Sequence, residues 1–154
     1  MDDKLFRAAM GKFATGVTII TTEIDGEVRG MTANAFMSVS MDPKLILISV
    51  GHKAKMKEQI EASGQFAVNV LSNDQKEMSM IFAGQKTDTH DVEFNYFEGL
   101  PVIDNSLVSI ACDVHNSHDE GDHTLFIGKV KNIEIQDGDP LAFHEGSYKQ
   151  LQEA

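Results

Sequence analysis

A run of β-branched residues followed by a tight-turn signal constrains the fold of this chain most. Residues 17–22 read VTIITT, and such side chains keep more of their freedom in an extended strand than in a helix. Asp25 and Gly26 follow shortly afterwards, and this dipeptide is typical of the turn of a β-hairpin. The sequence therefore predicts a strand at 17–22 that pairs with a second strand over about 28–37.

Further segments continue this strand pattern. Strands are predicted at 45–50, 66–71, 107–115 and 123–135, because these segments have the composition of strands and turn signals lie between them. Because the strands come as hairpin-like neighbours and do not alternate strictly with helices, we expect a mainly β fold, an antiparallel barrel with peripheral helices, rather than a doubly wound sheet.

Helical spacing of apolar residues is confined to three places. A short helix is expected from Leu5 to Phe13 behind Asp2 and Asp3, either of which can cap its first turn. Two more are expected over 53–62 and 73–84, where apolar residues recur one turn apart and a glycine follows or ends the segment. Residues 85–104 are polar and aperiodic, which predicts a long surface loop or lid.

Length and charge narrow the class of protein. The chain has 154 residues, the size of one domain, so we expect a single domain over 1–154. Its formal net charge of −11 disfavours nucleic acid as a partner. Cys112 is the only cysteine, which excludes an intrachain disulfide and fits reducing conditions. With no apolar leader or membrane-spanning run, a cytoplasmic protein that does not enter the membrane is expected.

Familiar motifs for phosphoryl transfer, dinucleotide folds, α/β-hydrolases and dithiol exchange are absent from the sequence. One expected hairpin is crowded with possible metal ligands, namely Cys112, His115, His118, Asp119, Asp122 and His123. Such side chains can bind Zn²⁺ or Fe²⁺. Residues 119–122 equally well form the turn between two strands, and no helical pair of histidines occurs. We therefore predict no metal site.

Residues 30–43, GMTANAFMSVSMDP, are the least ordinary stretch. Small and hydroxyl-bearing residues stand there in place of bulk, so the backbone can approach a flat ligand closely and the side chains can hydrogen-bond to it. A simple edge strand rich in small residues is the alternative.

Together with residues 13–18 (FATGVT) and 121–130 (GDHTLFIGKV), this stretch resembles the flavin reductase family of small NAD(P)H:flavin oxidoreductases. The resemblance covers nearly the whole chain. It implies the FMN-binding split barrel, a Greek-key-like antiparallel barrel that forms a homodimer. It also implies FMN or FAD as cofactor, NADH or NADPH as hydride donor, and a partner among flavin-dependent monooxygenases.

The same resemblance implies a set of flavin-binding residues. The edge that meets the isoalloxazine ring is expected at Met31, Thr32, Ala33 and Asn34, and the following flavin-facing turn at Ser38, Val39 and Ser40. Phe82, Ala83 and Gly84 resemble a segment that packs near the flavin, and Tyr148 one that closes the pocket. Phe82 can instead be plain core, and Tyr148 a surface residue.

A cationic segment between an expected strand and helix suits the flavin phosphate. Backbone N–H groups at a helix start favour anions, and Ser49, Val50, Lys53 and Lys55 lie in this segment. Related proteins usually carry more Ser or Thr with an Arg here, so phosphate contact would pass through lysine. The alternative is a solvated basic helix start.

His123 is the expected catalytic residue, because it lies in the Gly-Asp-His motif that resembles the nicotinamide side of the family's site. Its ring can donate a hydrogen bond to the carboxamide of the nicotinamide or to the reduced flavin, or it can merely satisfy a carbonyl in the hairpin. The predicted function is hydride transfer from NAD(P)H to flavin N5. Alternatives are a flavin-bound electron carrier or ferric-complex reductase, and a non-catalytic flavin- or haem-binding module.

Overall fold

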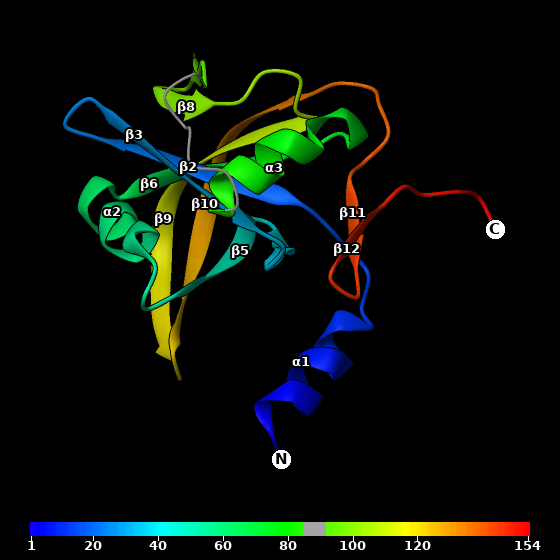
Figure 1. Cartoon of the computed structure of the whole chain (residues 1–154). Helices are drawn as coiled ribbons and strands as arrows, with labels where there is room; N and C mark the ends of the chain where they lie inside the picture. The colour runs from blue at the N-terminus through cyan, green and yellow to red at the C-terminus, as the bar shows by residue number, and fades with distance from the viewer. Residues whose placement is uncertain (85–91) are drawn as a thin grey trace.

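An antiparallel sheet forms the centre of the molecule (Figure 1) in the computed structural model, which describes residues 1–84 and 92–154. In these residues the sheet has seven strands in the order β3-β2-β6-β9-β10-β5-β4. Its strands are β2 (Thr18–Ile24), β3 (Glu27–Ala33), β4 (Phe36–Met41), β5 (Lys44–Gly51), β6 (Gln65–Val70), β9 (Val108–Glu120) and β10 (His123–Ile135). The expected mainly β, antiparallel fold is therefore confirmed.

The two edge strands of this sheet are neighbours in the chain. β3 and β4 stand at opposite ends of the strand order, yet only Asn34 and Ala35 link them. A link this short cannot span a flat sheet of that width. The sheet therefore curls until its two edges approach each other, and this leaves the β3 edge beside the interior.

Two separate groups of short strands complete the β structure of the described residues. β1 (Thr15–Gly16) pairs with β11 (Ala142–His144), which forms a hairpin with β12 (Ser147–Lys149). β7 (Asn95–Phe97) pairs with β8 (Leu100–Val102). The first group brings the C-terminal hairpin against β1, just before the first strand of the seven-stranded sheet.

Three helices lie around the sheet in the described residues. α1 (Asp3–Gly11) begins behind Asp2, whose side chain accepts a hydrogen bond from the N–H of Leu5, and it projects from the body in Figure 1. α2 (Lys55–Ser63) ends at Gly64, which has the left-handed conformation that glycine adopts without a Cβ penalty. α3 (Lys76–Phe82) follows the 3₁₀ turn η1 (Asn73–Gln75).

The interior of the curled sheet holds the main core. Phe66, Phe126 and Ile48 are its large, fully buried side chains, and α2 closes one side by inserting Met56 and Ile60. The apolar spacing that predicted this helix face is confirmed. None of the helices in the described residues is long and apolar enough to span a membrane.

Several expected boundaries are wrong. The strand expected over 28–37 breaks at Asn34, where the N–H of Phe36 bonds the Asn34 carbonyl in a turn. α2 begins at Lys55 rather than residue 53, because Ala54 is an extended N-cap. The loop or lid expected over 85–104 contains the β7–β8 hairpin, and its first residues, 85–91, lie outside the described residues. β9 runs five residues beyond the expected end.

Candidate functional site

The expected ring-binding edge lies on β3, at one end of the seven-stranded order. An edge strand leaves alternate backbone N–H and C=O groups outside the ladder, where they can bond a ligand. Met31, Thr32 and Ala33 are partly buried on this strand, and Asn34 is exposed just after it. Met31 and Ala33 also pack against the main core, and this packing fixes the position of the β3 edge.

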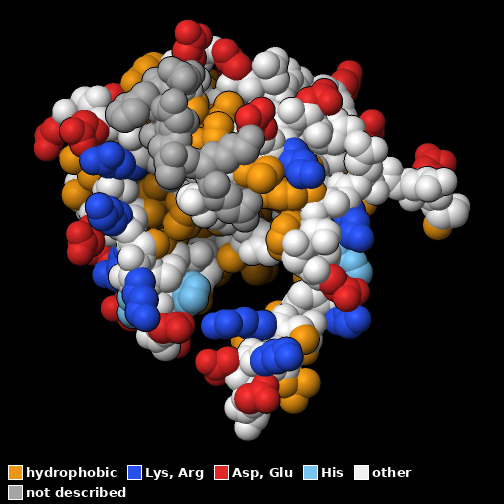
Figure 2. Space-filling view, in the orientation of Figure 1, with side chains coloured by type: hydrophobic (Ala, Val, Ile, Leu, Met, Phe, Trp, Pro, Cys, Tyr) orange, Lys and Arg blue, Asp and Glu red, His pale blue; other side chains and the backbone are white. Residues whose placement is uncertain are grey.

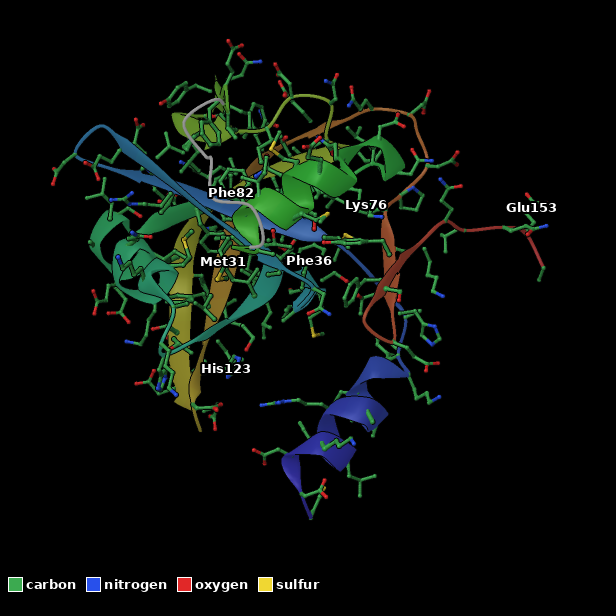
Figure 3. The ribbon with its side chains drawn as sticks, in the orientation of Figure 1. Met31, Phe36, Lys76, Phe82, His123 and Glu153 are labelled. Carbon is green, nitrogen blue, oxygen red and sulfur yellow. The ribbon has the colours of Figure 1, made fainter. Side chains whose placement is uncertain are left out.

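The end of α3 covers this edge. The ring of Phe82 lies against Gly30 of β3, and Figure 3 shows it above Met31. Ala83 and Gly84 follow at the exposed end of the helix. The hydroxyl of Thr32 donates to the carbonyl of Ser79 in α3 at 2.6 Å. Two segments that are some fifty residues apart in the sequence therefore form one wall.

Tyr148 reaches the same wall from the C-terminal hairpin. Its hydroxyl lies 2.8 Å from the hydroxyl of Ser79, and the ring of Phe143 meets it edge-on at 5.3 Å. Tyr148 is partly buried rather than a freely exposed surface residue.

A hollow of about 260 Å³ lies between β3 and the start of α2 and joins two parts of the expected site. Met31 and Lys55 line it together with Arg29, Gly30, Ala54, Met56 and Gln59. Lys53 lies on the exposed turn just before α2. Within the described part of the chain, the ammonium groups of Lys53 and Lys55 have no ion pair or hydrogen-bond partner. Both charges are therefore available to an anion.

His123 begins β10 beside the turn that leads to these lysines. It pairs with Gly51 of β5, and the N–H of His52 bonds the carbonyl of Asp122. The Nδ1 atom of His123 lies 2.8 Å from Asp122 Oδ1. Figure 3 shows His123 below Met31, toward the lower end of the β9–β10 hairpin.

Two carboxylates at this end of the β9–β10 hairpin are stabilised in their charged form. The hydroxyl of Thr124 donates to Asp119 and, helped by Lys57 and His52, holds the pKa of that carboxyl below its ordinary value of 3.8. The hydrogen bond and charge of His123 lower the pKa of Asp122 in the same way. Both therefore remain ionised near neutral pH, with Asp119 Oδ1 3.4 Å from Nε2 of His52 and Asp122 Oδ1 2.8 Å from Nδ1 of His123.

The remaining expected site residues lie on β5 and β4. Val50 is fully buried in the main core, so its side chain supports β5 rather than facing a ligand. Ser49 is partly buried on β5. Ser38, Val39 and Ser40 lie on the opposite edge strand β4, with a bulge at Val39. In the described residues no hydrogen bond joins these three to Met31, Lys55 or His123.

The structure adds residues that the sequence did not single out. Arg29 and Gln59 line the hollow beside Lys55, and Ser79 joins Thr32 to Tyr148. A serine inside an amphipathic helix carries no local signal of such a role. Asp122 was named from the sequence only as a possible metal ligand and as part of the Gly-Asp-His motif, and the structure adds its contact with the His123 ring.

A second and larger hollow, of about 1110 Å³, adjoins Asn34 on the other side. Its lining is mainly apolar and includes Met10, Phe13, Phe36 and Met37. Thr15 also lines it, and the Thr15 hydroxyl oxygen is buried without a partner among the described atoms. The face in Figure 2 is hollowed near its centre, with hydrophobic side chains and Lys or Arg around the rim.

The residues present fit a flavin. A flavin needs a flat apolar support, a hydrogen-bonding edge for its ring and cations for its phosphate. Met31 supplies the apolar support, and the β3 edge supplies the hydrogen-bonding groups. Lys53 and Lys55 supply the cations. Within residues 1–84 and 92–154 no group of three or more His, Cys, Asp or Glu side chains is placed to hold a metal ion. Burial raises the pKa of the Cys112 thiol to about 12, which keeps it protonated.

Comparison with known proteins agrees with this geometry. Residues 10–152 match the model of the flavin reductase like domain. An NADH-dependent flavin reductase from a Rhodococcus species is 44% identical over 149 residues, covering 95% of this chain and 85% of the relative. The reductase component of 4-hydroxyphenylacetate 3-monooxygenase from Thermus thermophilus is 33% identical, with 95% of each chain covered. The solved structure of flavin reductase PheA2 superposes with a TM-score of 0.97 at 60% identity, over 99% of this chain and 100% of that one.

Proposed function

This chain belongs to the flavin reductase like domain family, and from that premise we propose that it is an NADH-dependent flavin reductase working as a single domain over 1–154. The match across residues 10–152 carries the proposal. The similarity to a named NADH-dependent flavin reductase, over 95% of the chain, supports NADH as the hydride donor. FMN or FAD is the flavin.

Binding of the flavin falls to two parts of the chain. Met31 gives the ring an apolar support, and the unpaired backbone groups of the β3 edge give it hydrogen-bond partners. Lys53 and Lys55 attract the phosphate, and the N–H groups at the start of α2 add to this field. The chemistry that a bound flavin supplies is acceptance of a hydride at N5.

His123 is the residue that we assign to the nicotinamide. Its Nδ1 is engaged by Asp122, so Nε2 is the atom left for a ligand. When the ring is protonated, Nε2 donates a hydrogen bond to the carboxamide oxygen, which orients the nicotinamide for transfer. No protein nucleophile or general acid is required, because orientation and exclusion of water are the protein's tasks.

Dialysis followed by an NADH oxidation assay tests this function against its alternatives. We expect NADH consumption that depends on added FMN or FAD. Flavin that stays bound after dialysis, with little turnover of free flavin, would favour an electron carrier or ferric-complex reductase. No NADH consumption with either flavin would leave only a binding module and overturn the proposal.

We also propose that the protein is a homodimer. Phe13 and Met41 are about four-fifths exposed, and Leu5, Phe6, Met10 and Met37 are more than half exposed. Met10, Phe13 and Met37 among them line the larger hollow and form with it an exposed apolar surface. A monomer rarely leaves such a surface in water, and a second copy of the chain would cover it. Sedimentation should give a species of twice 17.0 kDa. A 17.0 kDa species at every concentration would refute the dimer.

The partner that we propose for the reduced flavin is a flavin-dependent monooxygenase. The Thermus relative, which is named as the reductase component of a monooxygenase, supports this assignment. A cytoplasmic site of action stays part of the proposal, since the lone cysteine fits reducing conditions. Addition of a candidate oxygenase should couple NADH oxidation to hydroxylation of its substrate. Hydroxylation that proceeds equally without this chain would argue against the pairing.

A further inference from the structure

Ser79 joins three segments of the candidate site that are far apart in the sequence. Its carbonyl oxygen accepts a hydrogen bond from Thr32 Oγ1 at 2.6 Å and another from the backbone N–H of Ala83 at 3.0 Å. Its hydroxyl lies 2.8 Å from the hydroxyl of Tyr148. The β3 edge, the end of α3 and the C-terminal hairpin therefore meet at one residue.

Ser79, at the centre of this junction, is shielded from solvent. It is fully buried, with no exposed surface, whereas Thr32, Phe82 and Tyr148 around it are each partly buried. Because Ser79 itself is buried, breaking its bond to Tyr148 leaves a polar atom of Ser79 without that partner, which is costly and holds the contact in place. A displacement of Ser79 would move the two segments that it holds.

The ring of Tyr148 is held in place by contacts with two other side chains. Phe143 packs against its ring edge-on, and the ammonium group of Lys76 lies 5.6 Å from the ring centroid. Lys76 is the first residue of α3, and Ser79 lies one turn further along. Tyr148 therefore holds α3 at two points, and the helix carries Phe82 onto Gly30 at its other end.

We propose that Ser79 and Tyr148 are positioning residues that set the β3 edge and the end of α3 at the separation that the flavin ring requires. This inference rests on the proposed flavin function. Neither residue needs to touch the ring: Tyr148 fixes Ser79, and Ser79 fixes the rotamer of Thr32 and the backbone at Ala83. Changes at Ser79 or Tyr148 should alter flavin affinity, because these two residues position the β3 edge and the end of α3 that hold the ring.

Flavin titrations on a double-mutant cycle test this role, with Ser79→Ala, Tyr148→Phe and the double variant measured by quenching of flavin fluorescence. Each single variant removes one hydroxyl of the same pair and should weaken flavin binding about 2- to 10-fold, the range for one neutral hydrogen bond. The double variant should bind no more weakly than the weaker single variant, because both changes remove the same contact.

Ser106→Ala is the matched control. Ser106 is also buried, and its hydroxyl donates to the carbonyl of Ile103 at 2.8 Å, away from the β3 edge. This variant should lose thermal stability to a similar extent as Ser79→Ala while keeping the flavin affinity of the parent. Riboflavin and FMN should lose affinity equally in the Ser79 variant, because the ring and not the phosphate is displaced.

Three outcomes would overturn the positioning role. The first is Ser79→Ala with lowered thermal stability but unchanged flavin affinity, which would make the residue purely structural. The second is an effect of Tyr148→Phe without one of Ser79→Ala, which would place the tyrosine hydroxyl on the ligand itself. The third is a parent protein that binds no flavin. A parent that binds flavin without oxidising NADH would refute the proposed function while leaving the titrations valid.

Discussion

Asp122 Oδ1 lies 2.8 Å from Nδ1 of the adjacent His123, and this contact leaves Nε2 as the ring atom that a ligand can meet. The carboxylate stays charged because its pKa is lowered by that same imidazole. His123 is thus paired with the residue directly before it, at the end of the β9–β10 hairpin.

Replacement of His123 by alanine should raise the KM for NADH or lower kcat, and flavin affinity should stay within a few-fold. The expected loss of transition-state stabilisation is about 1 to 3 kcal/mol, the range for a hydrogen bond to a charged or strongly polar group. Steady-state kinetics and a flavin titration on one variant measure both quantities. His115→Ala, an exposed histidine on β9, is the control. Lower thermal stability with unchanged kcat/KM would show that His123 only supports the hairpin.

Replacement of Lys53 and Lys55 together by glutamine should weaken FMN binding at least about tenfold and riboflavin binding far less. Only FMN carries the charge that the two ammonium groups would meet, and charge-assisted contacts are the stronger ones. The same change at Lys129 and Lys149, both exposed, removes equal charge from elsewhere and should leave both affinities alone. If both flavins lose affinity equally, the lysines act on something other than the phosphate.

Gly30→Ala should destabilise the protein by about 1 to 3 kcal/mol, the usual cost of extra bulk in a packed site. A Cβ there would lie 2.7 Å from two ring carbons of Phe82, so the ring or the strand has to move. Gly16→Ala is the control, because nothing lies within 4 Å of its added Cβ. Thermal unfolding compares the two variants. Equal thermal unfolding midpoints for the two variants would show that the Phe82 ring moves aside without loss of stability.

The pH dependence of stability should show the contribution of Asp119. Its pKa is lowered on folding, chiefly by the Thr124 hydroxyl, so the folded state favours the charged form. This stabilisation is present above the ordinary value of 3.8 and is lost as the pH falls through the lower, folded-state pKa. Thermal midpoints of the parent and Asp119→Ala should therefore differ at pH 6 and converge toward pH 3. A gap that stays constant over this range would mean that the carboxylate charge plays no part.

Local sequence patterns predicted the centre of the fold well. The β-branched run and the Asp25-Gly26 turn specify a hairpin that the β2–β3 register confirms, with Ile24 opposite Glu27. The spacing of Met56 and Ile60 gave the buried face of α2. These signals are local, because strand preference, turn conformation and helix periodicity are set by residues close in the chain.

Features set by long-range contacts were missed. The break between β3 and β4 falls inside an unbroken strand-like stretch, and it follows from the curl of the sheet rather than from Asn34 or Ala35 themselves. β11 and β12 are three residues each, and β11 pairs with the distant β1. The role inferred for Ser79 depends on partners 47 and 69 residues away.

The most direct test of the flavin reductase function is anaerobic mixing of the protein with NADH and FMN, with FAD in a parallel experiment. The account predicts that the visible absorbance of the oxidised flavin disappears as NADH is consumed in a one-to-one ratio, many times faster than in a mixture without protein. It also predicts that His123→Ala slows this reaction while the flavin still binds. NADH and oxidised flavin that persist together at the protein-free rate, for both flavins, would contradict it.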